Sequence, residues 1–494
     1  MVQDSGLRSE ERDLLTCLAE AIFLNPFNES PQPLDQLLPK VCLANQSRHE
    51  FRLNAISPVL TDRIAELDRR GLNSIRAFDR ADRSIVEYAY LFQLYQEVVD
   101  RFDQLIVEQS RPGAVLAPVP FASDLLSQMR TRGISTPDSL RYIGLFYQLR
   151  RAYYFIVQSL VGDSPSMKKL RYSLWNNIFT WDVRNYDQYL WGRMEDFSTL
   201  LLGETGSGKG AAAAAIGRSG FIPFDRESGR FTENFMETFV AINLSQFSEN
   251  IIESELFGHK KGAFTGAVDN HKGVFERCST NGALFLDEIG DVSSHVQIKL
   301  LKVVQERTFT PVGSRLEQRF SGRVIAATNR SLQQLRQEGC FRDDFYYRLC
   351  SDEIVVPPLR QRIREQPGEL ARMVGFLVFR TTGSESKILT ERVLAALSAD
   401  LPKNYGWPGN VRELEQAVRR ILLTGRYGGD PLVGLEKPDH QFYQQFQHGD
   451  FSAKELLSRY CQGLYKQYSS YEEVAKRLEL DRRTVKKYIH GDSS

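Results

Sequence analysis

A glycine-rich segment between an apolar run and an alanine-rich run constrains the fold more than any other part of this 494-residue chain. Leu200 to Leu202 ends a predicted strand, Gly203 to Lys209 (GETGSGK) forms a turn, and Ala211 to Ile216 lies in a predicted helix. Glycines let backbone N–H groups curl around phosphates, the helix N-terminus adds a positive dipole, and Lys209 can reach the β- and γ-phosphates. This order predicts a P-loop, although an ordinary glycine turn before a helix has the same local composition.

A pair of carboxylates follows an apolar run further along the chain. Ala283 to Leu286 predicts a strand buried on both faces, and Asp287 and Glu288 stand at its carboxyl end, where open α/β sheets bind ligands. We expect Asp287 to hold Mg²⁺, which prefers carboxylate and phosphate oxygens, and Glu288 to orient and deprotonate a water. The pair could instead only cap the next helix, but the P-loop upstream favours a nucleotide-hydrolysing core.

A loop of small residues around one aromatic lies between these two motifs. Glycines near both ends of residues 262–267 (GAFTGA) permit a tight, mobile tip, and so small a loop cannot bury Phe264 internally. An apolar side chain at an exposed tip indicates a partner contact. Composition alone instead favours a loop folded back on its own domain.

Together these segments resemble the AAA+ domain of bacterial enhancer-binding proteins, the ATPases that activate the sigma-54 form of RNA polymerase. The matching segments stand in the family's order and span about half of the chain, and GAFTGA is close to diagnostic for the family. They are VGDSPSM (161–167), GETGSGKG (203–210), FVAINLSQF (239–247), ESELFGHKKGAFTGA (253–267), GVFERCSTNGALFLDEIGD (273–291), QIKLLKVVQERTFTPVGS (297–314), VIAATNR (324–330), FRDDFYYRL (341–349), VPPLRQR (356–362) and YGWPGNVRELEQ (405–416).

The resemblance implies ATP with Mg²⁺ as the cofactors and gives roles to several polar residues. Asn243 matches the family's switch asparagine, which couples Glu288 to the nucleotide state, and Thr328 and Asn329 match sensor I, near the γ-phosphate. Arg412, in the helical lid, matches sensor II. The expected nucleotide-binding residues are Gly203, Glu204, Thr205, Gly206, Ser207, Gly208, Lys209, Gly210 and Arg412.

Arg342 and Arg348 match the family's arginine fingers. A guanidinium inserted from a neighbouring subunit neutralises charge on the γ-phosphoryl group, which is worth roughly 10³–10⁵ in rate in other NTPases. The resemblance therefore implies that a ring, expected to be a hexamer assembled from dimers, is the active unit. It also implies contact between sigma-54 in the RNA polymerase holoenzyme and the loop residues Gly262, Ala263, Phe264, Thr265, Gly266 and Ala267.

One position departs from the general P-loop pattern, which has Ser or Thr after the lysine to touch Mg²⁺, whereas this chain has Gly210. The family often has Glu there, so hydrolysis remains expected, with Asp287, phosphate oxygens and water holding the metal. Glycine also weakens the first helical turn by up to ~1 kcal/mol relative to alanine. Two alternatives stay open: a DNA-binding regulator with a degenerate motor, and an AAA+ remodeller that acts on a protein other than sigma-54.

The expected architecture is multidomain: a mainly helical N-terminal domain, an α/β AAA+ P-loop ATPase with a helical lid, and a C-terminal helix-turn-helix. The expected boundaries are 1–158 for a regulatory or sensory domain, 159–365 for the ATPase core, 366–426 for the lid, 427–450 for a linker and 451–494 for the helix-turn-helix. An aromatic segment around 177–197, longer than the family's usual connection, is expected to pack against the N-terminal helices or against the adenine side of the site.

Aromatic residues cluster near the end of the expected N-terminal domain. They either line a ligand pocket or, as is commoner for such a stripe, form core; they are Tyr142, Phe146, Tyr147, Tyr153, Tyr154 and Phe155. The six cysteines are scattered without a CxxC pair, which indicates reduced thiols and no structural zinc site. The N-terminus does not read as a signal peptide, and no run approaches the ~20 apolar residues of a membrane span. We therefore expect a cytoplasmic protein with no membrane partner.

The C-terminal segment 470–490 (SYEEVAKRLELDRRTVKKYIH) predicts two short helices joined at Glu479–Leu480, with Asp481 capping the second. Six basic residues against two acidic ones between 476 and 490 form a local excess in a chain of net charge +1, as phosphate binding requires. The segment resembles the Fis-like helix-turn-helix that ends many of these activators, although a solvated charged helix is the alternative. We expect dimeric binding to upstream double-stranded DNA through Arg482, Arg483, Thr484, Lys486 and Lys487.

Overall fold

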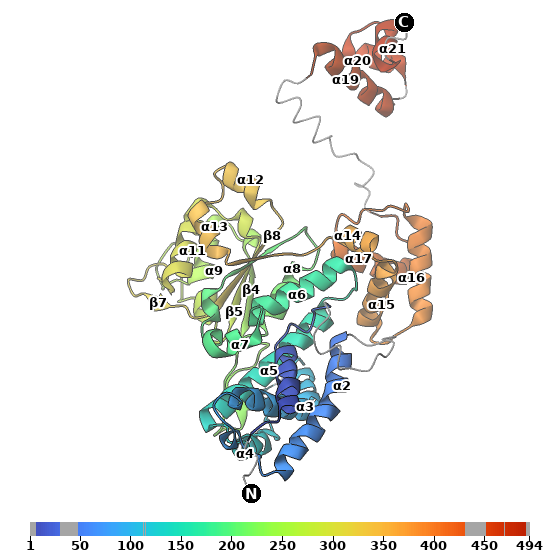
Figure 1. Ribbon diagram of the computed structural model, residues 1–494. Coiled ribbons are helices and arrows are strands. Elements are labelled where there is room, and N and C mark those ends of the chain that lie inside the picture. The colour runs from blue at the N-terminus through green and yellow to red at the C-terminus, as the bar shows by residue number, and fades with distance from the viewer. Residues whose placement is uncertain are drawn as a thin grey trace. The chain divides into compact units, whose positions relative to one another are not determined.

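The computed structural model describes residues 6–29, 48–111, 113, 115–429, 451–468 and 470–490. The chain divides into two compact units, Met1–Tyr427 and Gly428–Ser494 (Figure 1). The first unit holds the expected N-terminal, ATPase and lid segments together, and the second holds the expected DNA-binding segment. Most of the expected linker at 427–450 lies outside the described residues.

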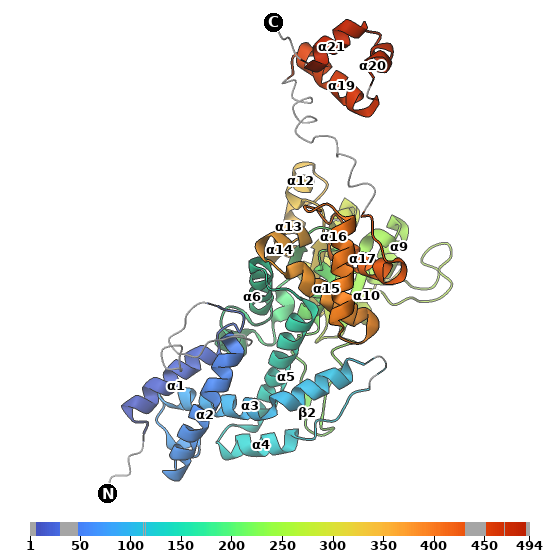
Figure 2. The ribbon, with the colours of Figure 1, turned by 90° about the vertical axis from the view of Figure 1, so that its right-hand side faces the viewer.

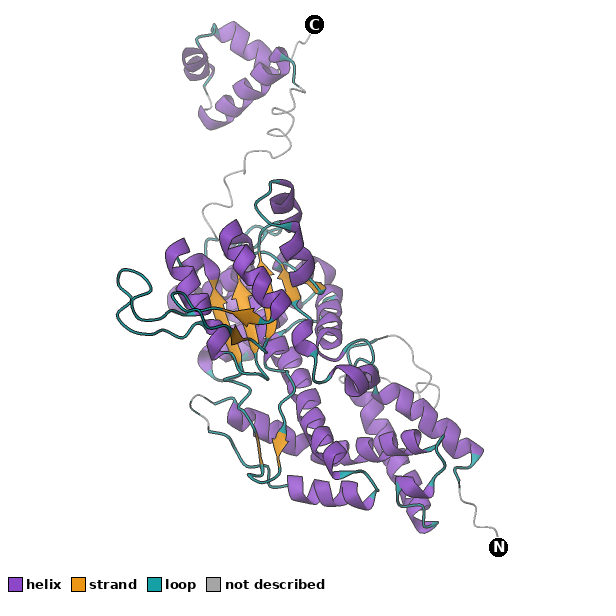
Figure 3. Ribbon diagram, turned by 90° about the vertical axis from the view of Figure 1, so that its left-hand side faces the viewer, coloured by secondary structure: helices purple, strands orange, loops and turns teal. Residues whose placement is uncertain are grey.

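A parallel sheet of five strands lies at the centre of the segment expected to be the ATPase core (Figure 3). Its order is β4-β5-β8-β1-β9, and every neighbouring pair is parallel. The strands are β1 (Thr199–Leu202), β4 (Phe239–Asn243), β5 (Ala283–Asp287), β8 (Arg323–Thr328) and β9 (Asp352–Val355). Because all five run in one direction, the residues after their carboxyl ends meet at one edge of the sheet. The predicted α/β P-loop core is confirmed.

The sheet is buried on both faces, as its apolar strands predict. Alternate side chains point to opposite faces, so Leu284 and Leu286 pack into one hydrophobic core and Phe285 into the other. The surrounding elements are α8 (Lys209–Gly217), η5 (Leu244–Gln246), α9 (Glu249–Phe257), α10 (Val274–Arg277), η6 (Ile289–Asp291), α11 (Ser294–Glu306), α12 (Leu332–Gln337) and α13 (Asp343–Leu349). Two short hairpins pair β2 (Phe224–Asp225) with β3 (Arg230–Phe231) and β6 (Thr308–Phe309) with β7 (Gln318–Arg319).

The helices that follow the sheet form a lid with a core of its own, centred on Val374, Leu397 and Leu414. They are α14 (Leu359–Glu365), α15 (Glu369–Thr382), α16 (Lys387–Asp400) and α17 (Asn410–Thr424). The start of α17 touches the P-loop, because the N–H of Val411 donates a 3.0 Å hydrogen bond to the carbonyl oxygen of Gly206. The lid is therefore bonded directly to the glycine loop.

The segment before the ATPase sheet is helical in its described parts. It contains α1 (Ser9–Ile22), α2 (Arg48–Arg69), η2 (Ile75–Ala77), α3 (Arg83–Gln109), α4 (Ala122–Thr131) and α5 (Thr136–Ser159). One core joins α1, α2 and α3, while the opposite side of α3 packs with α4 and α5 into a second core that continues to α8 and the sheet. Figure 2 shows α5 running from these helices toward the ATPase core. Packing is therefore continuous across the expected boundary at 158/159.

The connection between α5 and β1 contributes to this junction. It contains α6 (Pro165–Phe179), α7 (Val183–Asn185), a π-helical turn η3 (Tyr186–Leu190) and η4 (Met194–Asp196). Gln148 of α5 donates a 2.8 Å hydrogen bond to the hydroxyl of Tyr186, and Arg141 of α5 forms an ion pair with Asp187. Of the two positions expected for the aromatic segment around 177–197, the structure shows the one against the N-terminal helices.

The described part of the second unit contains α19 (Ala453–Tyr468), α20 (Tyr471–Leu478) and α21 (Arg482–His490). Val474, Ala475 and Val485 form its buried centre. The turn between α20 and α21 passes through Glu479 at φ 51°, and the N–H of Arg483 donates to the Asp481 carboxylate, which caps α21 as predicted. Across the described ranges, no helix is both long and apolar enough to cross a membrane.

Candidate functional site

The glycine loop joins the end of β1 to the start of α8. Gly206 and Gly208 adopt φ values of 75° and 115°, which side-chain-bearing residues rarely reach. A Cβ on Gly206 would lie 2.3 Å from the carbonyl oxygen of Gly409, so the loop passes directly beneath the lid. The Nζ of Lys209 donates to the carbonyl oxygens of Gly203 (2.9 Å) and Glu204 (3.3 Å), which places the ammonium at the loop itself.

The loop gathers hydrogen-bond donors in one place. Within the described ranges, the hydroxyl of Ser207 is buried and has no hydrogen-bond partner. Lys209 is buried, and desolvation lowers the pKa of its ammonium, although Glu288 and Asp287 oppose that shift. The first N–H groups of α8 also lack intrahelical acceptors. An anion with several oxygens satisfies this donor set, so the loop fits the phosphates of a nucleotide.

The two predicted carboxylates stand beside the loop at the end of β5. Burial raises the pKa of Asp287, and the charge of Lys209 opposes the rise. Burial likewise raises the pKa of Glu288. Asn243 lies opposite Asp287 in the register of β4 and β5. Mg²⁺ takes carboxylate oxygens as ligands beside phosphates. Asp287 is a half-buried carboxylate next to the phosphate loop, so it fits the expected metal.

Asn329 joins the carboxylate end of the site to the glycine loop. Its backbone N–H donates to the Oε2 of Glu288 at 3.2 Å, and its Nδ2 donates to the hydroxyl of Thr205 at 2.8 Å. Glu288 itself sits at φ 56°, a left-handed conformation that is uncommon outside glycine and asparagine. Asn329 therefore lies where it contacts both the expected base and the P-loop.

The side chains of Thr328 and Asn243 accept hydrogen bonds from residues two positions further along the chain. The hydroxyl of buried Thr328 accepts a 3.1 Å hydrogen bond from the N–H of Arg330. The amide oxygen of Asn243 accepts from the N–H (3.0 Å) and the hydroxyl (2.8 Å) of Ser245, which caps η5. The structure thus places Asn243 at the same sheet edge as Glu288, with its side chain turned to Ser245.

Two residues that the sequence reasoning missed connect the lid to the P-loop. Asn410 is fully buried at φ 53°; its Nδ2 donates to the carbonyl oxygen of Thr205 (3.1 Å), and its Oδ1 accepts from the N–H of Leu359 (2.8 Å). Arg360 forms an ion pair with Glu204 of the loop. The signal for Asn410 was its place after Trp-Pro-Gly at a helix start, where an asparagine tolerates a positive φ.

Arg412 lies two residues further along α17, near the glycine loop. Its N–H donates a 3.4 Å hydrogen bond to the carbonyl oxygen of Gly206, and its side chain is exposed. The charge of Arg412 also contributes to lowering the pKa of Asp287, against the larger effect of burial. Arg412 therefore belongs to the same cluster as Lys209 and the two carboxylates.

The two predicted arginine fingers lie elsewhere. Arg342 pairs with Asp344 (Nη2 to Oδ2, 2.7 Å), and Arg348 donates to the carbonyl oxygen of Val304 at 3.4 Å; both side chains are exposed. Among the hydrogen bonds of the described chain, neither guanidinium reaches the P-loop. Figure 1 shows α13, which carries Arg348, beside α11 and α12 and apart from the lid helix α17. Within the described residues, both arginines therefore bond away from the P-loop.

The GAFTGA loop is ordered at its base and exposed at its tip. Gly262 donates to the carbonyl oxygen of Ala267 at 2.9 Å, and both Gly262 (φ 80°) and Gly266 (φ 103°) use left-handed backbone. Phe264 is 46% exposed and contacts the ring of His259 edge-on, with 4.9 Å between centroids. Phe264 is therefore neither free nor folded into the core. Figure 2 shows the loops that follow α9 projecting from the body.

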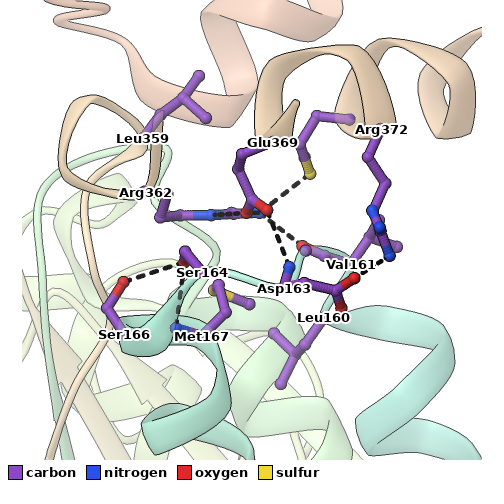
Figure 4. Close-up of polar contacts among 12 residues, drawn as sticks. Leu160, Val161, Asp163, Ser164, Ser166, Met167, Leu359, Arg362, Glu369 and Arg372 are labelled. Atoms are coloured by element: carbon purple, nitrogen blue, oxygen red, sulfur yellow. Dashed lines mark hydrogen bonds and ion pairs between the residues drawn. The ribbon is translucent and has the colours of Figure 1, made fainter. Parts of the chain in front are cut away.

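A polar cluster holds the segment VGDSPSM against the lid (Figure 4). The N–H of Asp163 donates to Glu369 at 2.8 Å, and Glu369 forms a fully buried ion pair of 2.8 Å with Arg362, which also donates to the carbonyl oxygen of Val161. Gly162 is required here, because a Cβ would lie 2.1 Å from a carboxylate oxygen of Glu369. The segment after α5 is therefore fixed to both the lid and α6.

The predicted DNA-contact residues lie on α21. Arg482, Arg483, Lys486 and Lys487 are exposed, and Thr484 is half-buried. Arg482 pairs with Glu472 at 2.9 Å, and the ammonium of Lys486 lies 5.5 Å from the ring centre of Tyr471. Helix α21 thus presents four exposed cations on the surface of the second unit.

Comparison with known proteins places the chain in a family. Residues 186–355 match the family described as the sigma-54 interaction domain. The transcriptional regulatory protein ZraR of Klebsiella oxytoca is 36% identical over 335 residues, which cover 66% of this chain and 67% of ZraR. The sigma54-dependent transcriptional regulator SfnR of Pseudomonas fluorescens is 37% identical over 278 residues, covering 55% and 69%.

The DNA-binding transcriptional regulator NtrC of Azospirillum brasilense is 37% identical over 277 residues, covering 56% of this chain and 50% of that protein. The matched part of this chain therefore spans between half and about two thirds of these relatives. The match includes the P-loop, the GAFTGA loop and both carboxylates, since all of them lie between residues 186 and 355. The chain belongs to the family of sigma-54-dependent transcriptional regulators that share the sigma-54 interaction domain.

Proposed function

We propose that this protein hydrolyses ATP as a ring of subunits and uses the hydrolysis to remodel sigma-54 RNA polymerase at promoters, while its C-terminal unit holds it on upstream DNA. The observation that carries the proposal is the pair of hydrogen bonds from Asn329, to Glu288 and to Thr205. They link the expected base to the loop whose donors fit nucleotide phosphates. Family membership supports sigma-54 as the partner.

Each residue of the site has a distinct chemical task in this proposal. Lys209 and the N–H groups at the start of α8 bind the phosphates, and Glu288 accepts the proton of the attacking water. Bound Mg²⁺, held by Asp287, supplies neutralisation of phosphate charge. Asn329 orients Glu288 through its backbone N–H. Because Asn329 touches both motifs, a movement of the loop on phosphate release changes the position of the base.

The arginine fingers require a second subunit. Arg342 and Arg348 are exposed and have no contact with the P-loop of their own chain among the described residues. A guanidinium that enters a neighbour's site neutralises γ-phosphoryl charge without further chemistry. We therefore propose that catalysis occurs at the interface between subunits, in a hexameric ring.

The two proposed partners, sigma-54 and DNA, are assigned to the loop tip and to the C-terminal unit respectively. Phe264 is half exposed between two glycines that permit movement, and Thr265 follows it. We assign the sigma-54 contact to this tip. The exposed cations of α21 follow a short turn after α20, the arrangement with which helix-turn-helix units enter the major groove, so we assign double-stranded DNA binding to this unit.

The test uses the full chain at concentrations that allow assembly. ATP turnover is measured for the wild type, Glu288→Gln and Arg342→Ala, and both variants are expected to lose most activity. Mixing Arg342→Ala with Glu288→Gln should restore part of it, because an interface whose base comes from the Arg342→Ala subunit and whose finger comes from the Glu288→Gln subunit has both groups intact. Equal turnover by wild type and Glu288→Gln would refute hydrolysis at this site.

A second experiment tests the sigma-54 contact separately. The protein is incubated with ADP and aluminium fluoride, a transition-state mimic, and purified sigma-54 is captured. Thr265→Ala should abolish capture while leaving ATP turnover intact, because Thr265 lies outside the nucleotide site. Ser314→Ala, in the neighbouring loop, is the control for a change of hydroxyl content. Capture that survives Thr265→Ala would remove the loop from the proposed interface.

A further inference from the structure

A cavity of about 460 Å³ lies between the N-terminal helices and the helix that precedes the ATPase sheet. Its walls come from the end of α1, from α3 and α5, and from Trp175 of α6 and Val183 of α7. This volume falls within the ~300–1,000 Å³ of pockets that hold small molecules. None of the nucleotide-site residues lines it, so it is separate from the ATP site.

Aromatic side chains form much of the wall, and they belong partly to the stripe seen in the sequence. Tyr147 and Phe155 of that stripe are buried as core, whereas Tyr142, Phe146 and Tyr153 line the cavity. Tyr95 of α3 packs edge-on against Phe146, with 5.2 Å between ring centres. The stripe is therefore mostly core, and three of its residues also line a cavity.

Two residues that line the cavity each carry a hydrogen-bond donor with no acceptor among the described residues. The donors are the indole Nε1 of Trp175 and the amide Nε2 of Gln96, and both atoms are buried. Trp175 as a whole is only 6% exposed, so solvent does not readily reach its nitrogen. A buried polar group without a partner costs about 1–3 kcal/mol in proteins, so a ligand acceptor that reaches either atom would be favourable.

The charged groups at the wall are already neutralised. Arg150 forms an ion pair with Asp103 (Nη2 to Oδ2, 2.6 Å), and Asp187 forms one with Arg141. An ionic ligand would lose its hydration in this cavity without finding an unpaired charge in exchange. An uncharged ligand avoids that cost and still buries its apolar surface.

We propose that this cavity binds an uncharged, largely apolar small molecule that carries at least one hydrogen-bond acceptor, oriented by the donors of Trp175 and Gln96. The aromatic wall supplies the apolar contact. Because Arg150 and Asp187 are already paired with other residues, neither offers a counter-charge to a ligand. The site therefore discriminates against carboxylates and amines of similar size.

The walls of the cavity connect it to the ATPase sheet. Asn177, two residues beyond Trp175 on α6, donates from Nδ2 to the Thr199 hydroxyl of β1 (3.0 Å) and to the Asp352 carboxylate of β9 (2.6 Å). The opposite wall, α5, packs against α8, the helix that starts at the P-loop. A ligand that moves α5 relative to α6 therefore changes ATP turnover. This step rests on the proposed function, whereas binding does not.

The experiment uses prodan, an uncharged naphthalene ketone whose emission shifts to the blue in apolar surroundings, with the full chain. Two valines of α3 give a matched pair: Val99 lines the cavity and Val107 is exposed outside it. Val99→Phe fills the space and should weaken binding about tenfold or more, whereas Val107→Phe should leave it unchanged. Trp175→Phe keeps a ring but removes the donor, and should weaken binding several-fold.

The results separate the site from its effect. Saturable binding of one prodan per chain, lowered by Val99→Phe and Trp175→Phe but not by Val107→Phe, supports the site; far-ultraviolet circular dichroism checks that each variant is folded. No saturable binding, or equal binding by the two valine variants, overturns it. Binding without any change in ATP turnover overturns the connection to the motor. Binding by a protein that turns over no ATP at all refutes the proposed function and leaves the site standing.

Discussion

Arg151 of α5 donates a 2.7 Å hydrogen bond from Nη1 to the carbonyl oxygen of Arg218, the residue that ends helix α8. Its Nη2 donates to the carbonyl oxygen of Gly220, also at 2.7 Å. Burial lowers the pKa of Arg151 to about 10, so the guanidinium stays charged at neutral pH. A cation at a helix C-terminus satisfies its last carbonyls and its dipole. An N-terminal helix therefore caps the far end of the P-loop helix.

The first prediction concerns this cap. Arg151→Met keeps an apolar stem but removes these donors from the carbonyls of half-buried Arg218 and Gly220, at ~1–3 kcal/mol for each unsatisfied group. We expect the free energy of unfolding of the first unit to fall by about 2–5 kcal/mol. Urea unfolding followed by circular dichroism measures the loss. Arg130→Met, an exposed arginine on α4, is the control, and equal losses for the two variants would contradict the role of Arg151.

A second prediction separates the side chain of Asn410 from its backbone. Asn410→Ala removes the bonds to Thr205 and Leu359 and also strains the positive φ, so we expect a loss of ~2–4 kcal/mol in unfolding free energy and weaker nucleotide binding. Asn410→Gly relieves the strain and should recover part of the stability but none of the nucleotide affinity. Thermal unfolding and titration with a fluorescent ATP analogue measure both. The exposed Asn404→Ala should change neither.

Gly210 gives a third prediction, because nothing lies within 4 Å of the Cβ that it lacks, and its φ is not positive. Gly210→Ala should raise the free energy of unfolding by about 0.5–1 kcal/mol through helix propensity. Gly210→Thr should lower the Mg²⁺ concentration needed for half-maximal ATP turnover, since it supplies the hydroxyl found in other P-loops. The neighbouring Gly208→Ala should instead destabilise, because φ is 115° there. An unchanged Mg²⁺ requirement in Gly210→Thr would show that Asp287 and water suffice.

Sequence reasoning placed the nucleotide site because each motif follows a strand. Lys209, Asp287 and Asn329 lie far apart in the chain, but parallel strands bring their carboxyl ends to one edge. The same reasoning could not predict that the Asn243 side chain points toward Ser245, because that orientation depends on local capping. Nor could it find Arg360, whose partner Glu204 lies on a different element, 156 residues earlier.

The packing of the N-terminal helices against the ATPase core could not be predicted from the sequence for a similar reason. The stripe on α5 predicts a buried face but does not say which element covers it. Helix α5 comes close to the segment after α8 because Gly144 has no side chain. A Cβ on Gly144 would lie 2.7 Å from the ring of Phe221. Contacts of this kind join residues about 70 positions apart and leave no periodic signal in either segment.

The pH dependence of stability provides a fourth prediction. Burial raises the pKa of Glu288 above its ordinary value. A carboxyl group whose pKa is higher in the folded protein binds its proton more readily when folded, so the folded state loses stability as pH rises through the interval between the two pKa values. Glu288→Gln cannot titrate. The melting temperature of Glu288→Gln relative to wild type should therefore increase as the pH rises above about 4, the ordinary pKa of a glutamate.

The measurement for Glu288 is a series of calorimetric melts without nucleotide. The exposed Glu385→Gln controls for the change of net charge, since it lies on the lid surface. A constant difference between Glu288→Gln and wild type at all pH values would show that the Glu288 carboxylate is not destabilised by its surroundings.

The last prediction concerns Arg483, which is exposed in the first turn of α21. Each phosphate contact that a cation makes on duplex DNA contributes about 0.9 to the slope of log affinity against log salt concentration. If Arg483 contacts a phosphate, Arg483→Ala should reduce that slope by about one in anisotropy titrations of a labelled duplex and weaken binding to all sequences alike. If it reads a base edge, the slope stays and discrimination between sequences falls. Lys387→Ala removes one exposed charge from the lid and should change neither the salt slope nor the discrimination between sequences. Equal effects of Arg483→Ala and Lys387→Ala would mean that α21 is not the DNA surface.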